Sequence, residues 1–206
     1  MLSFPNFFAA CSGRWITERT YHYAATGRIE RSHTEYVVEP MTEEKKQDIL
    51  SLLSSTNVKV DVKEVKSFPG FAIHFDTVSD IGERVSMSLS ALFVADAYVL
   101  AQEPSPPLLP VAAQLDDATD LVRGYYLRDE GYYDAGMTLS RFTYQPVRQT
   151  LEMTTFYRAS VAVDQMRFVA PDTRLRTIVT YQRPSDRQPP VEIQLVGFGV
   201  EHRQPA

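Results

Sequence analysis

The chain has 206 residues, of which 44% are hydrophobic and 23% are charged, and its formal net charge is −5. This length and balance predict one globular domain with a substantial core, spanning residues 1–206. The negative charge argues against nucleic acid or an anionic membrane as the main partner. No window approaches the roughly 18 apolar residues of a membrane span, so membrane insertion is not expected. The sole cysteine, Cys11, excludes an intramolecular disulfide and a multi-cysteine zinc site.

The N-terminal segment contains a lipobox-like Phe8-Ala9-Ala10-Cys11 sequence. It lacks a basic region ahead of the apolar run, and Pro5 and Asn6 break that run, so we predict a cytoplasmic protein. Phenylalanines at helical spacing predict a short amphipathic helix over Ser3 to Cys11 that packs on the core. Cys11 is then a small buried hydrophobic residue.

The first predicted strand begins at Gly13 and runs to about Tyr23. Side chains of a strand alternate between its two faces. One face of this strand therefore carries Trp15, Thr17, Arg19, Tyr21 and Tyr23. Ile29 to Glu39 is predicted as the hairpin partner, and Met41 to Ser54 as the one strong helix, with Thr42 as its N-cap.

The rest of the chain has the period-two alternation of strands. The predicted strands are Val58–Val62, Phe71–Phe75, Arg84–Phe93, Leu121–Arg128, Thr138–Tyr144, Thr150–Val161, Met166–Val169, Arg174–Gln182 and Glu192–Arg203. Four prolines predict a loop from Gln102 to Pro110. Roughly ten strands without a βαβ rhythm predict an all-β fold with minor α, an antiparallel up-and-down β-barrel with one N-terminal and one crossover helix. Polar residues on both strand faces favour a wet cavity.

Gly13-x-Trp15 matches the motif that opens the first strand of lipocalin-type barrels. In those barrels a basic residue of the last strand lies over the indole ring, and Arg203 can supply that cation–π contact. The expected barrel is therefore lipocalin-like or fatty-acid-binding-protein-like.

Arg174 and Arg176 share one face of a predicted strand, and Leu175 lies on the other. At roughly 3.3 Å per residue the two arginines are about 7 Å apart, a spacing that suits a pair of carboxylates or phosphates. Ordinary surface arginines are the alternative interpretation. The four histidines have no metal-ligand spacing, and the sequence contains no nucleophile-elbow, P-loop, dinucleotide or zincin motif.

Motifs spread in order along nearly the whole chain resemble the S-type phycobiliprotein lyases, the CpcS/CpeS group, which attach linear tetrapyrroles to light-harvesting proteins. The matching segments are FF…SGRW…ERT-Y-H (Phe7 to His22), PGFAIHFD (Pro69 to Asp76), YYLRDEGYYD (Tyr125 to Asp134), Arg141-Phe142, RFVAPDTRLRT (Arg167 to Thr177) and VEHR (Val200 to Arg203).

The resemblance implies a lyase that binds a phycobilin in the barrel cavity and presents it to a cysteine of an apo-phycobiliprotein subunit for thioether attachment. The phycobilin is its bound substrate, and no prosthetic group is expected. The pigment's two propionates require cations, its pyrrole N–H groups a carboxylate, and its rings aromatic walls. The residues predicted to meet these needs are Arg19, Arg174, Arg176 and Arg203 as ligand-binding cations, Glu201 as the catalytic carboxylate, and Phe75 and Tyr157 as walls.

Two other functions stay open at this point. One is a non-catalytic carrier of a fatty acid or other small hydrophobic acid, which needs an arginine cluster but no internal carboxylate. The other is a barrel with a filled interior that serves only as an interaction module. A homodimer is a further prediction that the sequence does not decide.

Overall fold

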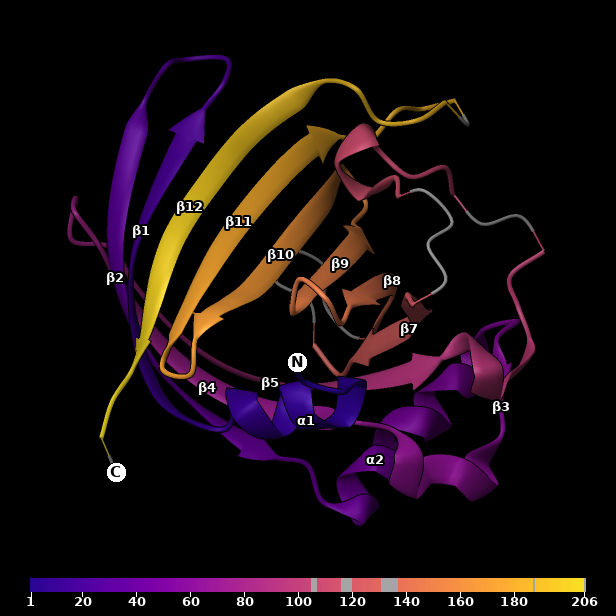
Figure 1. Cartoon of the computed structure of the whole chain (residues 1–206). Coiled ribbons are helices and arrows are strands. Elements are labelled where there is room, and N and C mark those ends of the chain that lie inside the picture. The colour runs from indigo at the N-terminus through magenta and orange to yellow at the C-terminus, as the bar shows by residue number, and fades with distance from the viewer. Residues whose placement is uncertain (105–106, 116–119, 131–136, 187, 206) are drawn as a thin grey trace.

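A closed β-barrel forms the body of the protein, in a computed structural model that describes residues 1–104, 107–115, 120–130, 137–186 and 188–205. Ten antiparallel strands run around it in the order β1-β12-β11-β10-β9-β8-β7-β5-β4-β2 (Figure 1). The predicted all-β antiparallel barrel with two helices is therefore confirmed. A single domain over residues 1–206 stays a prediction, and one closed barrel is consistent with it.

The barrel strands are β1 (Gly13–Tyr23), β2 (Ile29–Pro40), β4 (Gly70–Ser79), β5 (Arg84–Ala95), β7 (Val122–Arg128), β8 (Thr138–Gln145), β9 (Thr150–Phe156), β10 (Ser160–Ala170), β11 (Thr173–Gln182) and β12 (Ile193–Arg203). Outside the barrel, β3 (Lys59–Val60) pairs with β6 (Val99–Ala101). Short 3₁₀ turns occupy Leu52–Ser55, Val62–Ser67, Asp96–Tyr98 and Val111–Ala113.

Several predicted strands differ from the observed ones. Met166 to Val169 is only the end of β10, and β6 was not predicted. Val58 to Val62 shortens to β3 and continues as a 3₁₀ turn, because Asp61 caps that turn by accepting a hydrogen bond from the Lys63 amide at 3.1 Å. Thr150 to Val161 is two strands, since the Tyr157 amide bonds to the Ser160 carbonyl and closes a tight turn. No glycine or proline marks that turn, so alternation alone missed it. The proline-rich loop lies outside the strands in its described part, which leaves out residues 105–106. The last four residues of the YYLRDEGYYD segment, 131–134, are also outside the described part.

The two α-helices have the predicted positions (Figure 1). Helix α1 (Phe4–Cys11) packs Phe7 and Phe8 into the barrel core, where they are 0% and 5% exposed. Helix α2 (Glu43–Ser51) packs on the outer face of β5 and β7, and Thr42 caps it by accepting from the Lys45 amide. In the described part of the chain, no helix is long and apolar enough to cross a membrane.

The first strand, the last strand and α1 are joined around Trp15. The Arg203 guanidinium lies 4.8 Å from the centre of the indole, which confirms the predicted cation–π contact. Arg203 also donates hydrogen bonds to the carbonyl oxygens of Ser12, at 3.0 Å, and Ala10, while the indole N–H donates to the Cys11 carbonyl at 2.8 Å. Arg203 is thus committed to the helix end and is not among the residues that line the barrel cavity.

Replacing Arg203 by Gln should destabilise the fold by about 2–3 kcal/mol, because two charge-assisted hydrogen bonds and a cation–π contact are lost. Chemical denaturation measures this free energy. Arg14→Gln, at an exposed position of the same strand end, is the control and should change it by less than about 0.5 kcal/mol. Equal stability of the two variants would show that Arg203 does not hold α1.

Candidate functional site

A cavity of about 450 Å³ runs through the barrel from Cys11 of α1 to Tyr23 and Leu195 at the other end. This volume lies within the roughly 300–1,000 Å³ of small-molecule sites. Its apolar walls include Phe75, from β4, and Met153, from β9. A barrel with a completely filled interior is therefore wrong for this chain.

Three arginines of the cavity converge on one buried carboxylate. Glu201 on β12 lies directly across from Arg174 on β11. Arg19 on β1 and Arg176 on β11 both lie across from Gly199, two residues before Glu201 on the same face of β12. Strand alternation thus points all four side chains into the barrel, as predicted for the arginine pair.

The carboxylate is fully buried, and its ionised form is stabilised. Its Oε2 lies 2.9 Å from Nη2 of Arg174, and its Oε1 lies 3.3 Å from Nη2 of Arg19 and 3.6 Å from Nη1 of Arg176. Burial alone would raise the pKa of Glu201, but the three guanidiniums outweigh it and lower the pKa to about 2. Glu201 is therefore an anion at any physiological pH.

Arg174 is the most enclosed of the arginines, with 2% of its side chain exposed. Its guanidinium lies 4.0 Å from the centre of the Trp15 ring and donates a 2.6 Å hydrogen bond to the Tyr36 hydroxyl. Burial opposes its charge, but Glu201 raises the pKa of Arg174 above its ordinary value. This pair links the cavity to the closed end of the barrel.

Arg176 holds a second acid, Asp164, which reasoning from the sequence missed. Its Nε donates to Oδ1 of Asp164 at 2.8 Å, and its Nη2 donates to Oδ2. Asp164 lines the cavity and its side chain is 20% exposed. The available signal was parity: on β10, Asp164 shares the inward face with Ala162 and Met166.

Two glycines on β12 make room for this arrangement. A Cβ on Gly199 would come within 3.0 Å of the Arg19 side chain and 3.1 Å of the Thr17 hydroxyl. A Cβ on Gly197 would meet the Tyr21 ring at 2.9 Å. The bare backbone of β12 therefore lets side chains of β1 cross over it toward the centre of the cavity.

A fourth arginine of the cavity lies apart from this cluster. Arg128, at the end of β7, is 5% exposed and donates a 2.7 Å hydrogen bond to the Tyr157 hydroxyl. Its guanidinium also lies 5.7 Å from the ring centres of Tyr126 and Tyr157. Arg128 falls inside the LRDEG segment, but its strand parity was not used to place it in the cavity.

The cavity region carries an excess of positive charge. The arginines that line it are Arg19, Arg128, Arg174 and Arg176. All except Arg128 contact the carboxylates of Glu201 or Asp164. Among the residues that line the cavity, guanidiniums outnumber carboxylates. At the far end, Glu30 also lines the cavity, and it pairs with Arg28 at 3.1 Å. A dianionic ligand matches this balance.

The structure brings together most of the predicted site residues. The predicted residues that line the cavity are Arg19, Phe75, Tyr157, Arg174 and Arg176. Arg203 lies at the end of α1 instead, so the geometry does not support its predicted contact with a ligand. Glu201 lies inside the barrel as predicted, but it is 0% exposed behind the arginines, so a ligand in this cavity meets the arginines first. Its catalytic role stays a prediction.

A lipocalin-like barrel with a cationic, aromatic-walled ligand cavity is the class that this fold and site define. Residues 3–105 and 98–204 match the family model described as CpeS-like protein. The chain belongs to this CpeS-like family. It is 38% identical to "Chromophore lyase CpcS/CpeS 1" of Synechococcus sp. (strain JA-3-3Ab) over 200 residues, which cover 97% of this chain and 96% of that protein. The solved S-type phycobiliprotein lyase CpeS of Guillardia theta has the same fold, with a TM-score of 0.67, 15% identity, and coverage of 100% of this chain and 94% of that one.

The buried carboxylate should make stability depend on pH in the acid range. Because folding lowers the pKa of Glu201, its contribution is complete above the unfolded value of about 4.3 and is lost as pH falls toward 2. We therefore expect the free energy of unfolding in urea to fall between pH 5 and pH 2 by about 3 kcal/mol more in the parent than in Glu201→Gln.

The control for this measurement is Glu83→Gln, which neutralises an exposed carboxylate. Its acid-range loss should follow that of the parent. If the parent and Glu201→Gln lose stability in parallel, the three arginines do not stabilise the ionised carboxylate.

Proposed function

We propose that the chain is a chromophore lyase that binds a phycobilin in the barrel cavity and presents it to a cysteine of an apo-phycobiliprotein subunit. The observation that carries this proposal is the positive excess of the cavity, set among aromatic walls, in a member of the CpeS-like family. The named relative, a chromophore lyase that matches along nearly its whole length, supports the same activity.

The cavity fits the chemistry of a linear tetrapyrrole. Two propionates are dianionic near neutral pH, and the guanidiniums that line the cavity can pair with them. Arg19 and Arg176 present one cationic edge beside β12, and Arg128 presents another on β7. Phe75 and Tyr157 supply ring faces for the pyrroles.

The chain itself supplies orientation rather than a nucleophile. The acceptor thiol adds across the exocyclic ethylidene double bond of the pigment, so a carbon–sulfur bond forms, the thiol proton ends on the pigment, and no oxidant is needed. Fixing the propionates on the arginines holds the pigment in one extended pose and limits addition to one carbon and one face.

The two carboxylates divide the work in this proposal. Asp164 lies in the cavity wall and is the acid placed to accept hydrogen bonds from pyrrole N–H groups. Glu201 is a positioning residue, because its charge holds Arg19, Arg174 and Arg176 in one cluster. The catalytic effect that the sequence predicted for Glu201 would then be indirect and act through the positions of the arginines.

A carrier of a fatty acid or other small hydrophobic acid is the second hypothesis from the sequence. It requires one arginine cluster and no internal carboxylate. Glu201 and Asp164 both lie inside the barrel, so this arrangement favours the lyase. A cytoplasmic location and a homodimer stay predictions.

The direct test mixes the purified chain with a phycobilin and an apo-phycobiliprotein subunit. The lyase function predicts a coloured complex with the pigment, followed by a pigment–cysteine thioether on the acceptor that survives denaturation. A complex that never transfers its pigment indicates a carrier, and the absence of any coloured complex would contradict the proposal.

Arg176→Met should weaken phycobilin binding roughly ten- to hundredfold, because a charge-assisted contact is worth about 1.5–3 kcal/mol. Absorbance titration of the pigment measures the affinity. Arg167→Met, which removes an exposed arginine of β10, is the matched control and should bind like the parent. If both variants bind alike, Arg176 makes no contact with the pigment.

Asp164→Asn should shift the absorbance of the bound pigment to the blue. A carboxylate beside the pyrrole nitrogens favours the protonated pigment, which absorbs further to the red than the neutral form, and the amide lacks that charge. The transfer rate should also fall. A variant with an unchanged bound spectrum would place Asp164 in a structural role on Arg176 alone.

A further inference from the structure

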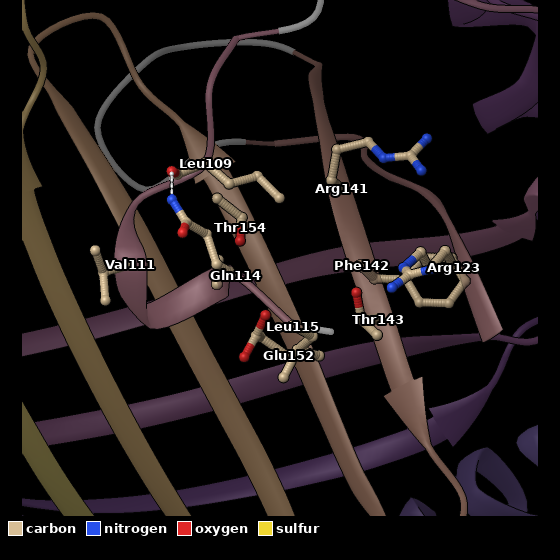
Figure 2. Close-up of a pocket in the computed structure, with 11 residues that line it drawn as sticks. Leu109, Val111, Gln114, Leu115, Arg123, Arg141, Phe142, Thr143, Glu152 and Thr154 are labelled. Atoms are coloured by element: carbon tan, nitrogen blue, oxygen red, sulfur yellow. Dashed lines mark hydrogen bonds between the residues drawn. The ribbon is translucent and has the colours of Figure 1, made fainter. Parts of the chain in front are cut away.

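A second cavity, with a volume of about 700 Å³, lies on the outer face of the barrel. Its floor is formed by β7, β8 and β9, and segment 109–115 crosses over it (Figure 2). The floor side chains Arg123, Thr143 and Glu152 have outward parity, so they point away from the ligand cavity. The proposed lyase reaction does not use this outer cavity.

Glu152 is the unusual residue of this outer cavity. It is only 2% exposed, and its Oε2 accepts a 2.6 Å hydrogen bond from the Gln165 amide. Gln165 is held in turn by the Thr177 hydroxyl at 3.3 Å. Within the described residues the polar partner of the Glu152 carboxylate is Gln165 and no cation pairs with it, and burial raises its pKa. Buried carboxylates are normally paired with a cation, so this one is suited to receive a cation from outside.

Thr143 and Thr154 neighbour Glu152 on the same outer face and add two hydroxyl acceptors to the outer cavity. Thr143 is directly across from Glu152 in the β8–β9 ladder. Thr154 lies two residues further along the same face of β9 and also lines the outer cavity. A carboxylate and two hydroxyls match the three N–H donors of a primary ammonium group, which has no acceptor of its own.

The remaining lining sets the shape and direction of the ligand. Leu115 lies beside Glu152 and Leu109 lies by Thr154, so apolar surface adjoins the Glu152 side (Figure 2). On the other side, Arg123 lies across from Thr143, about two strand spacings or roughly 10 Å from Glu152. Arg141, across from Thr154, also lines the outer cavity, and its guanidinium is paired with Asp96. A ligand cation is therefore drawn to the Glu152 side, with its carbon chain under segment 109–115.

We propose that the outer cavity binds a primary alkylammonium group, with its head on Glu152 and its aliphatic stem under Leu109 and Leu115. A lysine side chain of a partner protein and a free aliphatic amine share this chemistry. The site is separate from the barrel cavity, so the inference does not depend on the proposed lyase function.

The test titrates the full-length protein with n-pentylamine and follows backbone amide shifts by NMR. Saturable shifts are expected at Thr143, Glu152, Thr154 and Leu115, and the neutral analogue 1-pentanol should not produce them. Glu152→Gln should weaken binding at least tenfold, whereas the surface control Glu83→Gln should leave it unchanged.

Binding of 1-pentanol like that of the amine, or unchanged affinity in Glu152→Gln, would overturn the inference. Thr143→Val keeps the carboxylate and should weaken binding severalfold. This variant decides the case if Glu152→Gln fails to fold. Unchanged amine affinity in Thr143→Val would also overturn the inference. The peptide acetyl-Leu-Lys-Leu-amide separates the two sources: tighter binding than pentylamine assigns the site to a partner's lysine, and weaker binding assigns it to a free amine.

Discussion

The ion pair of Arg174 with Glu201 is the interaction on which the rest of the site depends. Removing two charges from water costs several kcal/mol each, and that cost is offset only by close, well-bonded partners. Here the carboxylate has three guanidiniums within 3.6 Å, and Arg174 also contacts Trp15 and Tyr36. The same pair therefore places the Arg174 guanidinium on the Trp15 indole and fixes the positions of the arginines that face a ligand.

In this arrangement the residue that keeps the arginines together is not one that a ligand contacts. Glu201 is hidden and keeps the arginines together, while Arg19 and Arg176 reach the cavity with part of their side chains exposed. The glycine at position 199 allows this because no side chain stands between the two arginines on β12. A pigment with two propionates would meet a preorganised surface, and little reorganisation would be needed on binding.

The sequence predicted the fold and the inward arginines because strand parity and turn signals are local properties. Trp15, Arg19, Arg174 and Arg176 all follow from alternation. Parity cannot predict depth, so it did not show that Glu201 is covered by the arginines or that Arg203 ends on the helix carbonyls. Asp164 could have been found from parity on its own strand. The outer cavity at Glu152 could not, because segment 109–115 crosses over β7, β8 and β9 without any local sequence signal (Figure 2).

The central claim is that the cavity recognises a dianionic pigment through its excess guanidinium charge. Titrating the chain with a phycobilin and with its dimethyl ester tests this most directly, because the ester keeps the ring system and loses both negative charges. The account predicts that the free acid binds at least about a hundredfold more tightly, since two charge-assisted contacts are lost in the ester, and that added salt reduces the difference. Equal affinity for the acid and the ester would contradict it.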